Sequence, residues 1–240
     1  MNYGLIFAGG VGHRMNTKAK PKQFLEIHGK PIIVHTIEYF QKNTEIDYIC
    51  VVVLDDYIDY MKQLILRFQL SKVKWVVPGG NTSLDSQYNG LKAIKEYSQT
   101  DKDIVLIHDG VRPLINTELI SRCIADVKEF GSAVTIAPAI ETIVQTDGAD
   151  TIQTTIERSK CFLARAPQCF YLDDILSAHE RAIQENNHIF IDSTSLMLHF
   201  DYKVHIVEGP AENIKVTNPS DFYICRALLD AREDSQLYGI

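Results

Sequence analysis

The chain opens on Tyr3-Gly-Leu-Ile-Phe-Ala-Gly-Gly-Val-Gly-His-Arg-Met15, and Lys20-Pro-Lys-Gln-Phe24 follows a few residues later. The apolar run Leu5–Ala8 predicts a buried strand, and three glycines follow within the next four residues. Glycines let a backbone approach an anion closely and point N–H groups at it. The cations Arg14 and Lys22 supply the full charges that phosphate oxygens attract. The stretch therefore predicts a strand and a phosphate-binding loop; an ordinary turn with solvated basic residues is the alternative.

The opening loop follows neither of two well-known phosphate-binding motifs. A Walker A loop requires Gly-x-x-x-x-Gly-Lys-Ser/Thr, which the chain does not contain. A dinucleotide fingerprint requires Gly-x-Gly-x-x-Gly at the start of a helix, but Met15 takes the place of the third small residue and Lys18–Lys22 does not resemble a helix start. The loop thus favours a nucleoside triphosphate bound in another way and argues against a nicotinamide-dependent oxidoreductase.

Length and charge restrict the class of protein. The 240 residues suit a single α/β domain spanning 1–240, and a net charge of −7 argues against binding to nucleic acid or an anionic membrane. The five cysteines are scattered, which indicates a reducing compartment and no zinc site. No basic segment precedes an apolar core at the start, and no apolar run is long enough to span a bilayer. We therefore expect a cytoplasmic protein without a secretory signal.

Apolar runs alternate with segments of helical periodicity in the first half of the chain. This alternation predicts an α/β fold with a Rossmann-like, mostly parallel twisted sheet flanked by helices. The expected strands are Leu5–Ala8, Tyr48–Leu54, Val73–Val77, Ile104–His108, Ala133–Ala137 and, later, Lys203–Val207. The expected helices are Ile32–Lys42, Tyr57–Gln69, Ser86–Tyr97, Thr117–Phe130, Leu172–Gln184 and Pro219–Arg232.

The segment at about 139–160 has a different character. Ile140–Gln145 and Thr151–Glu157 are β-rich and flank Asp147-Gly148, which predicts a hairpin turn. A hairpin without a core of its own must pack on another surface. A second subunit and the protein's own sheet are the two candidates, and the sequence does not choose between them.

Two further turns are expected to join the opening loop, because ligands collect at the carboxyl ends of parallel strands. Pro78–Ser86 carries glycines, hydroxyls and a helix start, and suits an anion or the polar edge of a base; a well-capped loop is the alternative. His108–Pro113 brings Asp109 and Arg112 to the end of a buried strand. The Asp109 carboxylate could bind Mg²⁺ together with substrate phosphates, or could simply pair with Arg112.

The types of residue found in these turns indicate a phosphoryl-type transfer reaction. They are rich in cations, and the chain contains no recognisable nucleophile motif. In such transfers, positioning and charge neutralisation supply most of the catalysis. Lys215, in a short β-like run, reads by itself as an ordinary surface lysine, and His108 reads as a structural histidine.

Four motifs in order resemble the cytidylyltransferases that act on polyol phosphates. They are Phe7–Met15, Pro21–Phe24, His108–Pro113 and Asn213–Thr217, and the resemblance runs from Tyr3 to about Asp221. The family includes the methylerythritol-phosphate enzymes of isoprenoid synthesis and the ribitol-5-phosphate enzymes of teichoic acid and capsule synthesis. Gly110-Val-Arg112 resembles the ribitol branch more closely.

The resemblance implies CTP and a polyol phosphate, most simply D-ribitol 5-phosphate, as substrates, Mg²⁺ as cofactor, and a homodimer joined through a β-arm. The catalytic residues implied are Arg14, Lys22 and Lys215. The nucleotide-binding residues implied are Phe7, Ala8, Gly9, Gly10, Gly80, Asn81, Asp85, Ser86, Asp109, Gly110 and Arg112. Asp109 is also the implied metal ligand, and the implied acceptor-binding residues are Arg158, reaching across from the partner's arm, Asp192 and Lys215.

Three positions depart from the family pattern. Ser83 stands where an arginine is usual, Ile191 where a threonine is usual, and Ala166 where Thr-Pro-Gln begins. The last two lie on the acceptor side, so methylerythritol phosphate or another alditol phosphate remains open as the acceptor. A non-catalytic nucleotide-binding protein is the alternative from another class.

Overall fold

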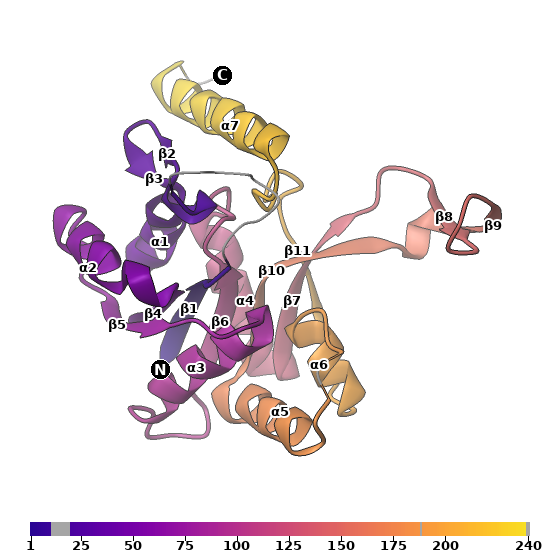
Figure 1. The fold of residues 1–240 in the computed structure, drawn as a ribbon, viewed down its shortest axis with the longest axis horizontal. Helices are drawn as coiled ribbons and strands as arrows, with labels where there is room; N and C mark the ends of the chain where they lie inside the picture. The colour runs from indigo at the N-terminus through magenta and orange to yellow at the C-terminus, as the bar shows by residue number, and fades with distance from the viewer. Residues whose placement is uncertain (11–19, 188, 239–240) are drawn as a thin grey trace.

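The structure is a computed structural model in which residues 1–10, 20–187 and 189–238 are described (Figure 1). A seven-stranded sheet forms its centre, in which β10 is antiparallel to both its neighbours and every other pairing is parallel. In spatial order its strands are β11 (Ile206–Glu208), β7 (Ser132–Pro138), β10 (Phe162–Tyr171), β6 (Ile104–Asp109), β1 (Asn2–Ala8), β4 (Tyr48–Val53) and β5 (Val73–Pro78). The predicted mostly parallel sheet is thus confirmed.

Helices cover both faces of the sheet (Figure 1). One face packs against α1 (Ile32–Lys42), α2 (Ile58–Arg67) and α4 (Thr117–Phe130), and the other against α3 (Ser83–Lys95), α5 (Leu172–Gln184) and α6 (Ser193–His199). Successive strand residues point to opposite faces. Ile6 accordingly lies in the first apolar cluster and its neighbour Leu5 in the second, both fully buried. Such near-continuous apolar strands are typical of a sheet covered on both sides.

The last helix, α7 (Pro219–Tyr238), packs beside the small sheet of β2 (Glu26–Ile27) and β3 (Lys30–Pro31). Short 3-10 turns occur at Lys22–Phe24, Asp55–Tyr57 and Arg158–Lys160. Even α7, the longest described helix with its 20 residues, carries too many polar groups, and no described helix has the length and apolar character needed to cross a membrane.

Helix predictions agree closely with the structure, whereas two late elements were missed. Helices α1, α4 and α5 have the predicted bounds. β10 was not predicted because Pro167 interrupts its apolar pattern, and its pairing with β7 shifts register between Ala164 and Gln168. α6 was not predicted because its seven residues are too short to show a helical period. The late strand at Lys203–Val207 is displaced, since β11 begins at Ile206.

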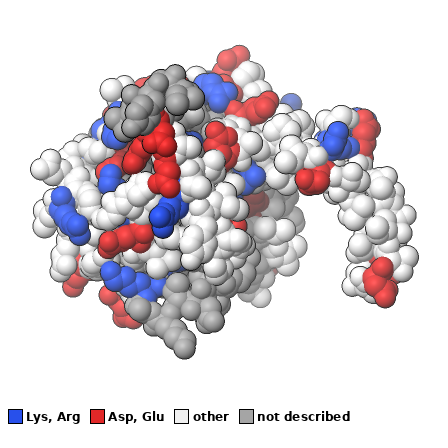
Figure 2. All heavy atoms as spheres, turned by 90° about the horizontal axis from the view of Figure 1, so that it is seen from above, with Lys and Arg blue, Asp and Glu red and all other residues white. Residues whose placement is uncertain are grey.

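The predicted hairpin is confirmed as an arm. β8 (Ile143–Thr146) and β9 (Ile152–Ile156) pair antiparallel around Gly148, whose φ of +88° is readily adopted by glycine. The arm projects from the body (Figure 1), and Figure 2 shows it standing out as a largely uncharged lobe. β8 and β9 form a sheet of their own, and every residue of β9 is exposed. The alternative that the hairpin packs on the protein's own sheet is therefore wrong.

Candidate active site

A cavity of about 550 Å³ lies where β1, β5 and β6 end. The chain runs from β1 to β4 and β5 on one side and later adds β6 on the other side of β1, so a crevice forms beyond their carboxyl ends. The predicted convergence of the three turns is therefore what the structure shows. The cavity is lined by Phe7, Ala8, Gly9, Gly10, Lys22, Gln23, Leu54, Gly80, Asn81, Thr82, Ser83, Ser86, Asp109, Val111, Lys215 and Thr217.

The opening loop is held against its neighbours by close backbone packing. Gln23 Nε2 donates to Ala8 O at 2.7 Å and to Gly10 O at 3.5 Å, which ties the Pro21–Phe24 motif to the end of β1. A Cβ on Gly9 would lie only 2.6 Å from Ser86 Oγ, so glycine is needed where this loop meets α3. Arg14, a predicted catalytic residue, lies outside the described residues.

The start of α3 forms a polar wall of the cavity. Thr82 Oγ1 accepts from Asp85 N at 3.1 Å, and the Asp85 carboxylate accepts from Thr82 N at 3.0 Å, which makes a capping box. Ser86 Oγ accepts from Gly80 N at 3.0 Å and donates to Thr82 O at 2.9 Å. A helix N-terminus of this kind presents hydroxyls and N–H groups to an anion or a polar base edge. The Asp85 carboxylate is used for the cap and lies outside the cavity lining.

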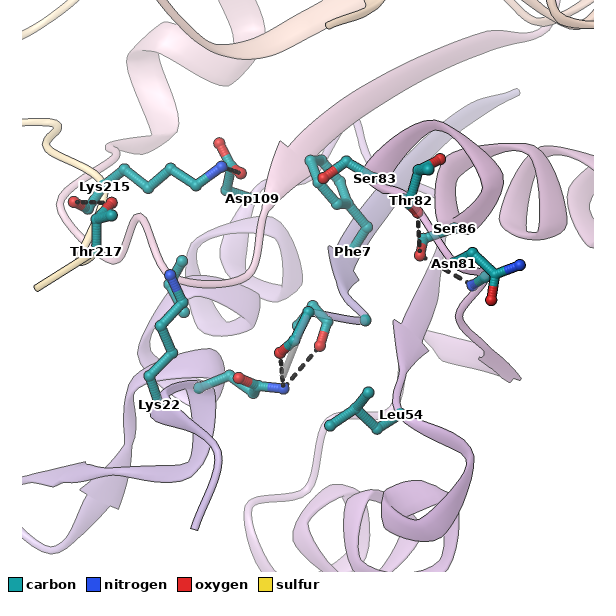
Figure 3. Close-up of a pocket in the computed structure, with 16 residues that line it drawn as sticks. Phe7, Lys22, Leu54, Asn81, Thr82, Ser83, Ser86, Asp109, Lys215 and Thr217 are labelled. Carbon is teal, nitrogen blue, oxygen red and sulfur yellow. Dashed lines mark hydrogen bonds and ion pairs between the residues drawn. The ribbon is translucent and has the colours of Figure 1, made fainter. Parts of the chain in front are cut away.

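The opposite wall carries the charges. Arg112 Nε donates to Asp109 Oδ2 at 2.7 Å, and Lys215 Nζ contacts Asp109 Oδ1 at 2.5 Å. Lys22 Nζ donates to Val216 O at 3.0 Å, which brings the two lysines to the same side of the cavity. Figure 3 shows Lys215 and Asp109 on one side, Thr82, Ser83 and Ser86 on the other, and Lys22 on the Lys215 side with its amino group directed toward Lys215 and Thr217.

Electrostatics keep this wall charged. Burial raises the pKa of Asp109, but Lys215 and then Arg112 outweigh burial and hold that pKa well below its ordinary value. Asp109 is therefore ionised at neutral pH. The described lining holds two lysines and one carboxylate, a net charge of +1, which suits a polyanionic ligand.

His108 has the structural role expected from the sequence. Its ring is fully buried, and Nε2 lies 3.1 Å from Arg112 O. Burial lowers the pKa of His108 to about 4, so the ring is neutral at physiological pH. It lines neither cavity and steadies the turn that carries Asp109 and Arg112.

A second cavity of about 210 Å³ adjoins the first, and the two share Phe7, Ser83, Asp109 and Lys215. Arg112, Arg165, Gln168 and Asp192 are among its other lining residues. Asp192 Oδ1 accepts from Ser195 N and Oδ2 accepts from Gln168 Nε2, both at 2.8 Å. The Asp192 carboxylate thus caps α6 while its side chain borders the cavity.

The structure brings together most of the predicted site residues. The first cavity collects Phe7, Ala8, Gly9, Gly10, Lys22, Gly80, Asn81, Ser86, Asp109 and Lys215, and the second adds Arg112 and Asp192. Gly110 is buried behind the wall, where a Cβ would lie 3.0 Å from Ala8 Cβ, and Arg158 is exposed on the arm outside both cavities. Sequence reasoning did not single out Gln23, Leu54, Val111, Thr217 and Gln168, although all but Leu54 lie within motifs it quoted.

Asp109 is the described side chain best placed to hold a metal ion. No three His, Cys, Asp or Glu side chains within residues 1–10, 20–187 and 189–238 are arranged to bind one. Mg²⁺ is commonly held by one or two carboxylates, with waters and substrate phosphates completing its ligands. A lone ionised carboxylate beside a cationic cavity fits that mode, although both Asp109 oxygens already contact cations.

Comparisons with known proteins agree with this geometry. The family described as IspD, 2-C-methyl-D-erythritol 4-phosphate cytidylyltransferase, matches residues 3–231. The ribitol-5-phosphate cytidylyltransferase of Streptococcus agalactiae serotype III is 55% identical over 240 residues, covering 100% of both chains. The 2-C-methyl-D-erythritol 4-phosphate cytidylyltransferase of Clostridium acetobutylicum is 37% identical over 230 residues, covering 95% of this chain and 97% of that protein. The crystal structure of the 4-diphosphocytidyl-2C-methyl-D-erythritol synthase from Anaerococcus prevotii superposes with a TM-score of 0.81 at 26% identity, covering 95% of this chain and 96% of that one.

Proposed function

This chain belongs to the 2-C-methyl-D-erythritol 4-phosphate cytidylyltransferase (IspD) family, and on that premise we propose that it transfers the cytidylyl group of CTP to D-ribitol 5-phosphate. The products are CDP-ribitol and pyrophosphate. The observation that carries the choice of acceptor is the 55% identity, over the whole of both chains, to a ribitol-5-phosphate cytidylyltransferase. The methylerythritol-phosphate relative is more distant, at 37%.

The presence of two adjoining cavities supports a proposal in which each cavity binds one of the two substrates. In our proposal CTP occupies the first, with its base against the glycine loops and its phosphates against Lys22 and Lys215. The alditol phosphate occupies the second, and the shared wall at Asp109 and Lys215 is where the two meet. An oxygen of the acceptor's phosphate group forms a bond to the α-phosphorus of CTP as the bond from the α-phosphorus to the bridging β-phosphate oxygen breaks, so the diphosphate linkage of CDP-ribitol forms and pyrophosphate leaves.

Lysine charge is the chain's main contribution to this step. Negative charge builds up on the oxygens around the α-phosphorus and on the leaving pyrophosphate, and a preorganised cation stabilises it without reorganisation. Lys215 is oriented by Asp109, and Lys22 by Val216 O. Asp109 would hold Mg²⁺, which when bound neutralises phosphate charge as a Lewis acid. Arg14 is proposed to act beside Lys22, as the family resemblance implies.

A pyrophosphate-release assay tests the activity and the acceptor. With CTP and Mg²⁺, ribitol 5-phosphate is expected to give the highest kcat/KM in a panel that includes methylerythritol 4-phosphate and other alditol phosphates. A preference for methylerythritol 4-phosphate would replace the proposed acceptor. Binding of CTP by calorimetry without pyrophosphate release from any member of the panel would instead favour a non-catalytic nucleotide-binding protein.

The exposed arm supports a further part of the proposal, a homodimer. Ile152 and Ile156 on β9 are 61% and 44% exposed, and Phe162 and Leu163 at the base of the arm are about as exposed. A two-stranded hairpin with exposed apolar side chains needs another surface to stabilise it. A second copy of the chain would cover this surface and would bring the Arg158 side chain of one arm toward the acceptor site of the other copy.

Light scattering after gel filtration tests the homodimer. The expected molar mass is twice the 27.2 kDa of one chain. Replacing Ile152 and Ile156 by aspartate is expected to shift the protein toward one chain, because the charges would lie in the apolar contact. Leu66→Asp, at a side chain 79% exposed on α2, is the matched control and is expected to leave the mass unchanged. A single-chain mass for the unmodified protein would contradict the dimer.

A further inference from the structure

The second cavity contains a cation whose charge the described residues leave unmatched. Three cationic side chains line this cavity, but Arg112 and Lys215 both contact the Asp109 carboxylate. The Asp192 carboxylate is engaged by Ser195 N and Gln168 Nε2. Arg165 has no ion pair with any described residue, and its Nε is buried without a hydrogen-bond partner. A buried unsatisfied donor is costly and therefore suggests a ligand that completes it.

The backbone around Arg165 is held in place by three side chains from different elements. Arg165 O accepts from Gln168 Nε2 at 3.4 Å, Ala166 O accepts from Asn213 Nδ2 at 2.7 Å, and Pro167 O accepts from Thr135 Oγ1 at 2.8 Å. These contacts fall where β10 leaves its pairing with β7, between Ala164 and Gln168. The Arg165 Cα is thus fixed beside the cavity before any ligand arrives, which lowers the entropic cost of binding.

The surroundings of Arg165 favour an anion. Burial lowers the pKa of Arg165 and the nearby Arg112 lowers it further, but a guanidinium remains protonated in proteins. The three cations of this cavity face two carboxylates, Asp109 and Asp192, so its described lining has a net charge of +1. The planar guanidinium donates in a fork that matches two phosphate oxygens.

We propose that Arg165 binds the phosphate group of the acceptor, the group whose oxygen attacks the α-phosphorus of CTP. This proposal rests on the proposed function. The cation that binds the acceptor phosphate would then belong to the same chain as Lys22 and Lys215. Arg158 of the same chain is exposed on the arm and cannot take this role, since it lines neither cavity.

Because the two cavities share a wall, Arg165 could instead bind the phosphates of CTP. The KM for CTP and the KM for the acceptor, measured separately, distinguish these two ligands. Arg165→Ala is expected to raise the KM for ribitol 5-phosphate about ten- to a hundred-fold, the value of one or two charge-assisted hydrogen bonds, with the KM for CTP within about two-fold. Arg165→Lys, which keeps the charge but loses the fork, is expected to lie between. Arg226→Ala, at an exposed arginine on α7, is the matched control.

Two outcomes overturn the proposal. An acceptor KM within two-fold of the unmodified protein removes Arg165 from acceptor binding, and an equal rise in the KM for CTP assigns it to the nucleotide. Thermal melting of each variant shows whether it is folded. If Arg165→Ala is not folded, the KM values of Arg165→Lys are compared with those of the unmodified protein instead.

A binding measurement keeps this test separate from the proposed activity. Inorganic phosphate is titrated into protein already saturated with CTP, so that the nucleotide fills the first cavity. Weaker phosphate binding by Arg165→Ala than by the unmodified protein supports the site even if ribitol 5-phosphate gives no turnover. Equal phosphate binding by the two proteins overturns it, whatever the enzyme's acceptor.

Discussion

Lys22→Ala is expected to lower kcat by about 10²–10³, the scale measured when one charge-stabilising donor is removed from an active site. Lys22 lines the first cavity, and its Nζ is held 3.0 Å from Val216 O, next to Lys215. Its charge would act on the phosphate oxygens as the α-phosphorus is attacked. The loss is therefore expected in kcat, measured as pyrophosphate release at saturating CTP and ribitol 5-phosphate, more than in the KM for either substrate.

Two variants make the Lys22 result specific. Lys22→Arg keeps the positive charge and is expected to retain more activity than the alanine variant. Lys42→Ala, at an exposed lysine near the end of α1, removes the same side chain outside both cavities and is expected to leave kcat unchanged. If Lys22→Ala turns over at the rate of the unmodified protein, Lys22 has no part in the chemical step.

Asp109→Asn is expected to lower the free energy of unfolding by about 2–4 kcal/mol, because it leaves two cations without their counter-charge. The Asp109 and Arg112 side chains are only 10% and 11% exposed, so solvent compensates little for the lost pair. The Lys215 side chain is 37% exposed, so solvent screens its interaction with Asp109, and losing that interaction adds less to the expected change in the free energy of unfolding. Urea unfolding at pH 7 measures the difference, and Asp59→Asn, in an exposed pair with Lys62, is expected to cost less than about 1 kcal/mol.

The same carboxylate gives the stability a pH dependence with a definite sign. Because its pKa is lower in the folded protein than in the unfolded chain, the Asp109 contribution is complete above the ordinary aspartate pKa near 4. It decreases as the pH falls below that value and the unfolded chain takes up the proton first. The gap in unfolding free energy between the unmodified protein and Asp109→Asn should therefore narrow on acidification. A gap that stays constant down to pH 3 would show that the ion pairs contribute little.

Most of the fold could be predicted from local patterns in the sequence. The apolar residues of α1, α4 and α5 recur with the helical period, and their predicted bounds match the structure. The strand ends and their glycine-rich or charged turns were also readable, because a change from apolar to polar residues marks where a buried strand stops. β10 could not be predicted, because Pro167 interrupts its apolar pattern and its antiparallel place between β6 and β7 depends on partners far away in the chain.

Side-chain partners in the site depend on the tertiary structure for the same reason. The carboxylates of Asp85 and Asp109 look alike in the sequence, yet one caps α3 and the other joins two cations in the cavity wall. Arg165 was not among the predicted site residues, and its buried Nε and its place in the second cavity became visible only once β10 was placed.

The amino-acid sequence by itself determined which segments become helices and strands and which turns carry the phosphate-binding residue types, because periodicity and turn chemistry act over a few residues. Tertiary structure alone decided which charges face one another. Lys22 contacts the carbonyl of Val216 across 194 positions of the chain, and Asp109 contacts Lys215 across 106 positions. Contacts over such separations form only when the sheet sets the carboxyl ends of its strands side by side, and no local pattern encodes their distances.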